Sequence, residues 1–140
     1  MSDTNKAPWH LWVVGILALL WNGFGAFDFT ASALRFEAYL AAIPQAMLDH
    51  IYAQPVWLWA VWAIGTWGGV IGAILLLLRN KLAVLALALS FIGASASQAP
   101  SIIEPPMDIG APPFLPWIII AISVALLAYA FWLSRRGVLR

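Results

Sequence analysis

In this chain of 140 residues, 64 % are hydrophobic and only 9 % are charged, against roughly a quarter in a typical soluble domain. A soluble domain of this size could not bury so much apolar surface, whereas a lipid bilayer accepts it. The net charge of +1, with no large basic cluster, argues against nucleic acid as a partner. The absence of cysteine excludes disulfides, thiolate metal sites and lipidation at cysteine.

Four long apolar runs cover residues 11–29, 56–78, 82–99 and 114–133. A bilayer core about 30 Å thick is crossed by about 20 helical residues, and a helix satisfies its own backbone hydrogen bonds in hydrocarbon. We therefore predict a single all-α membrane domain over residues 1–140. Its four transmembrane helices form a bundle, with the first span beginning at about residue 9.

The start of the chain also has features of a secretory signal peptide. Lys6 could form the basic n-region, and residues 31–33 (Ala-Ser-Ala) resemble a cleavage site. However, a signal h-region has about 7–15 residues, and this apolar run is longer. Cleavage would also leave three spans, so we expect the first helix to be retained.

Two polar residues stand inside the first span. Asp28 is its only ionisable residue, and an intramembrane carboxylate often marks function. The simpler interpretation places Asp28 at the outer interface, where it caps local backbone or meets Ser32. Asn22 lies deeper and needs a hydrogen-bond partner, for which an interhelical bond is the simpler expectation and a solute is the alternative.

The first outer loop, residues 30–54, has helix-forming composition on both sides of Pro44. We predict two short interfacial helices, the second over residues 45–52 with Pro44 at its start. A continuous helix would also place Trp21, Asp28 and Arg35, spaced by seven, on one face. Arg35 could then pair with Asp28. The candidate polar site, for a solute or for assembly, comprises Asn22, Asp28, Arg35 and Glu37.

Small residues dominate one side of the second span. Two overlapping G-x-x-x-G pairs let a neighbouring helix approach closely; these pairs are formed by Gly65, Gly68, Gly69 and Gly72. The third span offers Ser90 and other small residues at helical spacing. Because residues 79–81 allow only a tight hairpin between these spans, packing within the chain is the simpler use, and contact with another subunit is the alternative.

The second outer loop, residues 98–116, contains six of the nine prolines. We expect it to be extended polyproline II with turns. Tryptophans near the ends of the spans suit the headgroup level of the bilayer. The six predicted interface anchors are Trp9, Trp12, Trp57, Trp59, Trp117 and Trp132.

The basic residues give an orientation. With four spans, six of the seven basic residues fall on one side, namely Lys6, Arg79, Lys81, Arg135, Arg136 and Arg140. Only Arg35 falls on the other side, together with most of the acidic residues. The positive-inside rule then predicts that both termini are cytoplasmic.

No catalytic motif is present, and His10 and His50 fall on opposite sides, so they cannot share a metal. We expect no enzyme, no metal and no cofactor.

Three segments carry a family resemblance: residues 20–28 (LWNGFGAFD), 37–40 (EAYL) and 62–70 (WAIGTWGGV). They resemble a family of small four-helix bacterial inner-membrane proteins with a W-N-x-x-G-A-x-D motif, some of which are labelled sugar transporters. The resemblance covers about half the chain and not the third and fourth spans. It implies the same fold, a bacterial inner membrane, and Asn22, Asp28 and Glu37 as residues to test.

Two functions follow from these features. In the favoured one, the protein is a non-catalytic accessory subunit that packs on other membrane protein subunits in the lipid bilayer. In the alternative, it binds or moves a small, sugar-like solute through Asn22, Asp28 and the inner tryptophans. A sugar site needs several polar groups that converge in a cavity with aromatic side chains.

Overall fold

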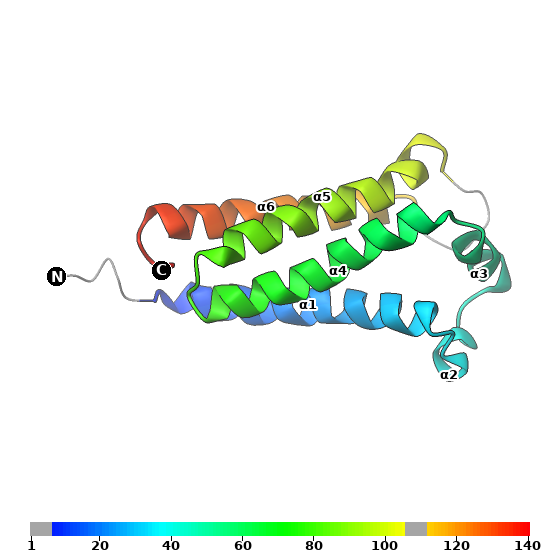
Figure 1. The fold of residues 1–140 in the computed structure, drawn as a ribbon, viewed down its shortest axis with the longest axis horizontal. Helices are drawn as coiled ribbons and strands as arrows, with labels where there is room; N and C mark the ends of the chain where they lie inside the picture. Colours follow the sequence, from blue (N-terminus) through cyan, green and yellow to red (C-terminus); the bar gives the residue numbers. More distant parts are fainter. Residues whose placement is uncertain (1–6, 106–111) are drawn as a thin grey trace.

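The computed structural model describes residues 7–105 and 112–140, and in that part of the chain every regular element is a helix. Four long helices lie roughly parallel (Figure 1): α1 (Trp9–Ala33), α4 (Val56–Leu77), α5 (Leu82–Ile103) and α6 (Leu115–Arg135). Each is long and apolar enough to cross a bilayer. The predicted all-α fold with four membrane-spanning helices is therefore confirmed.

The helices follow one another around the bundle. α1 packs on α4, α4 on α5 and α5 on α6, but in the described part of the chain α1 and α6 have no comparable contact along their length. Over the described residues, the bundle therefore lacks close packing between its first helix and its last helix. We call this boundary the α1–α6 seam.

The hydrophobic core occupies one half of the bundle. Its fully buried leucines include Leu11 at the start of α1, Leu76 at the end of α4 and Leu133 at the end of α6. These three helix ends lie at the end of the bundle that holds the C-terminus (Figure 1). That end also carries the basic residues Arg79, Lys81, Arg135, Arg136 and Arg140, and we call it the basic end. The opposite end, beside the short helix α3, we call the α3 end; Figure 1 shows the long helices splaying apart toward it.

A tight turn joins α4 to α5 at the basic end. Arg79 adopts a left-handed conformation with φ 59°, and the N–H of Asn80 donates to the carbonyl of Leu75 over 2.9 Å. This pattern closes the last turn of a helix. The Asn80 side chain then accepts from the N–H of Leu82 over 2.8 Å, which caps the start of α5. The predicted hairpin between the second and third spans is confirmed.

After α6 the chain reverses direction and packs against the basic end of the bundle, a feature that was not predicted from the sequence. Gly137, at φ 76°, reverses the direction of the chain, and the N–H of Val138 donates to the carbonyl of Leu133 over 3.0 Å. Val138 and Leu139 then enter the core with 4 % and 1 % exposure. The N–H of Arg140 donates to the carbonyl of Arg79 over 2.7 Å, so this segment closes the basic end.

Small residues bring α4 and α5 into backbone contact. A Cβ placed on Gly65 would lie 2.9 Å from the backbone nitrogen of Ala94, and one on Gly72 would lie 2.7 Å from the Leu87 side chain. The hydroxyl of Ser90 donates to the carbonyl of Gly65 over 2.6 Å and is buried. Gly68 also lies against Ser90, at an ordinary contact distance. The predicted small-residue side of the second span thus faces the third span of the same chain.

The start of the proline-rich segment differs from the prediction. Residues 98–103 were expected to be extended, but α5 continues through Pro100 to Ile103, and the N–H of Glu104 donates to the carbonyl of Pro100 over 2.9 Å. A proline removes only its own N–H from the helix, so the following residues still bond to preceding carbonyls. The middle of this predicted loop, like Lys6 and Asp108, lies outside the described residues.

The first outer segment is partly as predicted. α3 (Gln45–Tyr52) has the expected bounds and follows Pro44, whereas the helix expected before Pro44 is reduced to α2 (Glu37–Leu40). The reason is that α1 continues to Ala33 and the chain then turns at Arg35, which has φ 57°. The Tyr52 hydroxyl fastens α3 to α1 by donating to the carbonyl of Ser32 over 2.7 Å.

Five of the six predicted interface tryptophans have exposed side chains: Trp9, Trp12, Trp57, Trp117 and Trp132. The sixth, Trp59, instead stacks on Tyr52, with ring centroids 5.8 Å apart. It therefore holds α3 against α4 rather than standing alone at the surface.

The contact between α4 and α5 predicts a contrast between two glycines. Gly65→Ala should lower the melting temperature in detergent, because its methyl group would meet Ala94 backbone; overpacking of this kind costs about 1–3 kcal/mol. Gly23→Ala on α1 is the matched control, because no atom lies within 4 Å of its added Cβ. That change should be neutral or stabilising, by about 0.5–1 kcal/mol. Equal melting temperatures for the two variants would contradict the close α4–α5 contact.

Candidate functional site

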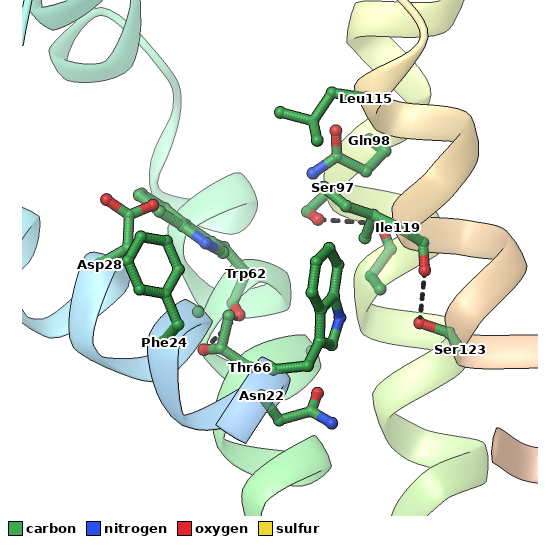
Figure 2. A pocket seen from close by; sticks show the side chains of 14 residues that line it. Asn22, Phe24, Asp28, Trp62, Thr66, Ser97, Gln98, Leu115, Ile119 and Ser123 are labelled. Atoms are coloured by element: carbon green, nitrogen blue, oxygen red, sulfur yellow. Dashed lines mark hydrogen bonds between the residues drawn. The ribbon is translucent and has the colours of Figure 1, made fainter. Parts of the chain in front are cut away.

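A cavity of about 360 Å³ lies among the four long helices, in the half of the bundle toward the α3 end. We call it the crevice. Figure 2 shows Asp28 and Phe24 of α1 on one side of this space and Ile119 and Ser123 of α6 on the other. Its lining is formed by Trp21, Asn22, Phe24, Gly25, Asp28, Trp62, Gly65, Thr66, Ala94, Ser97, Gln98, Leu115, Ile119 and Ser123.

The same packing that joins α4 to α5 makes room for the crevice. Gly65 and Ala94 meet at its wall and contribute almost no side-chain volume. On the facing side, Gly25 of α1 lies so close to Thr66 that a Cβ there would be 3.3 Å from the threonine methyl group. Small side chains therefore form the part of the wall where α4 meets α5, and in the described residues α1 and α6 make no comparable contact across the space.

Three hydroxyl groups line the crevice, one from each of α4, α5 and α6. Thr66 donates to the carbonyl of Trp62 over 3.0 Å, Ser97 to that of Ala94 over 2.9 Å, and Ser123 to that of Ile119 over 2.9 Å (Figure 2). Each proton is thus used within its own helix, as is common for Ser and Thr in membrane helices. The hydroxyl oxygens keep acceptor capacity for a ligand.

Asn22 is held in place by its surroundings. Its amide nitrogen donates to the carbonyl of Ala18 over 2.9 Å, so this bond lies within α1 rather than between helices as expected. Its amide oxygen lies against Gly69 of α4, where a Cβ would overlap it. Gly69 therefore serves the contact between α1 and α4 as well as the α4–α5 contact.

Asp28 has a different partner from those considered in the sequence analysis. The Tyr39 hydroxyl of α2 donates to its carboxylate over 2.5 Å, whereas Arg35 turns away and stacks over the ring of Tyr52, 4.1 Å from its centroid. The end of α1 at Ala33 breaks the predicted alignment of Trp21, Asp28 and Arg35. Burial of Tyr39, and then its bond to the Asp28 carboxylate, raise the pKa of Tyr39 to about 12.

The crevice also contains hydrogen-bond donors that no described residue satisfies. Within the described part of the chain, the amide of Gln98 and the indole N–H groups of Trp21 and Trp62 have no hydrogen-bond partner. Trp62 is fixed by ring contacts, edge-on to Phe29 at 5.1 Å and tilted against Trp59 at 5.3 Å. Rigid aromatic surface, donors and acceptors thus meet in one concave space.

A second hollow of about 650 Å³ adjoins the crevice at the α3 end, and we call it the vestibule. The two spaces share Trp62, Ser97, Gln98 and Leu115. The remaining vestibule lining includes His50 and Gln54 from the first outer segment and its junction with α4. The crevice and the vestibule are therefore adjacent at the α3 end and separated only by these shared side chains.

The four predicted polar residues are divided by the fold. Asn22 and Asp28 line the crevice, whereas Arg35 and Glu37 border a separate shallow hollow beside α2. Gln98 was missed as a site residue because it was assigned to the start of the proline-rich loop. Trp21 and Trp62, two tryptophans that lie away from the ends of their spans, also line the crevice.

The two histidines lie at opposite ends of the bundle. Nδ1 of His10 shares a hydrogen bond of 2.5 Å with the Tyr129 hydroxyl, which joins α1 to α6 near the basic end. His50 lines the vestibule. Among the described residues, no three His, Cys, Asp or Glu side chains come together as a metal site would require.

No family model, curated protein or solved structure matches this chain. The resemblance carried by the W-N-x-x-G-A-x-D motif therefore stays a prediction, and the function must be argued from the geometry of the crevice.

The contact between Tyr39 and Asp28 predicts a late alkaline titration. Phenolate absorbance should be followed at alkaline pH for the unmodified protein and for Tyr39→Phe. The difference between the two curves reports Tyr39, and its midpoint should lie near pH 12 rather than near 10. The pKa of Tyr39 is higher in the folded state than in the unfolded state. The contribution of the protonated Tyr39 to the free energy of unfolding is therefore complete below pH 10 and is lost as the pH rises toward 12. Asp28→Asn should lower the midpoint. A Tyr39 midpoint near 10 in the folded protein would contradict the contact.

Proposed function

We propose that this protein binds a small, uncharged, hydroxyl-rich solute in the crevice. The observation that carries the proposal is the convergence of tryptophans, hydroxyl oxygens and the Gln98 amide in one concave space. Binding sites for small molecules are clefts of this kind, mostly apolar with a few convergent polar groups. The alternative named from the sequence is thus the one that the geometry favours.

The polar groups favour a ligand that both donates and accepts hydrogen bonds. Hydroxyl groups of a ligand can donate to Ser97 and Ser123 and accept from Gln98. Among the described lining residues there is no Lys or Arg, and the one carboxylate, Asp28, already accepts from Tyr39. An anionic ligand would therefore lack a counter-ion, which is costly in a low-dielectric site.

The proposed setting is a bacterial inner membrane with the basic end in the cytoplasm. This orientation rests on the positive-inside rule, and the membrane type rests on the family resemblance. The vestibule and the crevice then open toward the outer side. We propose binding or passage of a solute rather than catalysis, because Asp28 is the only acidic or histidine side chain among the described lining residues of the crevice.

The accessory-subunit function remains a second proposal. It is supported by the first outer segment, where α2 and α3 contain no buried residue and the flanking Leu34 and Val56 are 77 % and 83 % exposed. Another membrane protein subunit could cover this apolar surface. The small-residue side of α4 gives it no support, because α5 and α1 already occupy that side.

Titration of the protein in nanodiscs with methyl β-glucoside tests the solute proposal. Binding should be saturable, and Trp62→Ala and Gln98→Ala should each weaken it at least tenfold, about 1.4 kcal/mol. Trp67→Ala is the matched control, because Trp67 lies on the same helix, is 45 % exposed and does not line the crevice.

Absence of saturable binding, or an equal loss in the Trp67→Ala control, would contradict the solute proposal. If the protein also migrates in mild detergent as part of a larger assembly, the accessory function becomes the better account. Asp28→Asn then should change assembly or stability only modestly.

A further inference from the structure

We infer that the ligand of the crevice is an amphiphile, with an uncharged hydroxyl-bearing head at the α3 end and an alkyl chain along the α1–α6 seam. This inference rests on the proposed function and specifies the class of ligand.

The hydrogen-bonding capacity of the crevice is concentrated toward the α3 end. Gln98, whose amide has no partner in the described part of the chain, lies there with Ser97 where the crevice meets the vestibule. Figure 2 shows both near Leu115, and Asn22 and Ser123 at the other end of the space. At that deeper end Asn22 and Ser123 donate to their own helices, as Ser97 does, so the Gln98 amide is the group that distinguishes the α3 end. A polar head is therefore better satisfied at the α3 end.

The α1–α6 seam borders one side of the crevice, which is lined by residues of both helices. α1 and α6 lack close packing there, and the seam is bordered by apolar side chains, with Phe24 of α1 68 % exposed and Leu115 of α6 37 % exposed. In a bilayer these surfaces meet acyl chains. An alkyl chain could therefore lie partly in the crevice and partly in lipid without crossing a polar group.

The seam is closed at the basic end. The His10–Tyr129 hydrogen bond joins α1 to α6, and Leu11 and Leu133 are fully buried beside it. From Leu115 to Ser123 the part of α6 that lines the crevice has nine residues, a rise of ~12 Å over eight steps of 1.5 Å. The space thus has a polar mouth, an apolar side and a closed floor, which matches a head-outward amphiphile of the outer leaflet.

The lining excludes a strong phosphate site. No Lys or Arg is among the described residues of the crevice or the vestibule, and the titratable groups there are Asp28 and His50. An anionic phospholipid head would lack the cation that recognition of phosphate requires. A sugar or glycerol head suits the amide and hydroxyl groups instead.

Matched glucosides test the inference in nanodiscs, with empty nanodiscs correcting for partition into lipid. Octyl β-glucoside, kept below its micelle concentration, should bind at least tenfold more tightly than methyl β-glucoside. Ser123→Phe should remove this advantage by filling the deep end of the crevice, so that octyl and methyl β-glucoside bind to the variant with equal affinity. Val124→Phe is the control, because Val124 is the next residue of α6 and does not line the crevice.

The outcomes separate the two proposals. Saturable binding of methyl β-glucoside with no gain from the octyl chain, or a gain that survives Ser123→Phe, would overturn the amphiphile and leave the solute proposal standing. No binding of either glucoside would overturn both. If Ser123→Phe does not fold, Ile119→Trp fills the same space and should give the same loss.

Discussion

The backbone contact between α4 and α5 is the constraint on which the remaining structure depends. Gly65 and Gly93 face each other so closely that a Cβ on Gly93 would lie 2.7 Å from the Gly65 nitrogen. In a bilayer, where lipid chains are as apolar as leucine, such close contact replaces the hydrophobic effect as the force between helices. α4 and α5 thus form the centre of the bundle, and α1 and α6 attach to opposite sides of this pair.

Attachment to opposite sides explains why the bundle is closed at one end and open at the other. At the basic end, the His10–Tyr129 bond joins α1 to α6, and the returning residues Val138 and Leu139 are buried in the core. Toward the α3 end nothing comparable joins the two helices in the described residues, and the small residues of α4 and α5 leave a cavity. The closely packed half of the bundle at the basic end therefore holds the four helices together, and the half toward the α3 end contains the cavity.

Much of the fold could be predicted because it depends on local sequence. Apolar length gave the spans, Pro44 gave the start of α3, and residues 79–81 gave the hairpin. The continuation of α5 past Pro100 was missed, since a proline more often ends a helix than lies within its last turns. The burial of Leu139 was missed because it depends on tertiary contacts that no local pattern encodes.

The candidate site was predictable only in part. Asn22 and Asp28 stood out because polar groups in an apolar span need an explanation. Their convergence with Trp62 and Gln98 depends on the order of the helices around the bundle, which neither hydropathy nor motif spacing specifies. The predicted alignment of Arg35 with Asp28 was wrong because α1 ends at Ala33 and Arg35 itself adopts a left-handed conformation.

If a ligand-accessible space opens toward the α3 end while the α4–α5 contact stays closed, the two places should differ in their accessibility to water-soluble reagents. The chain has no cysteine, so single cysteines can be introduced without background. Ser97→Cys in the crevice and Ser90→Cys, 5 % exposed between α4 and α5, should be compared for their rates of reaction with a small hydrophilic thiol reagent in nanodiscs. The structure predicts rapid labelling at position 97 and protection at position 90. Equal protection at both positions would contradict an open crevice.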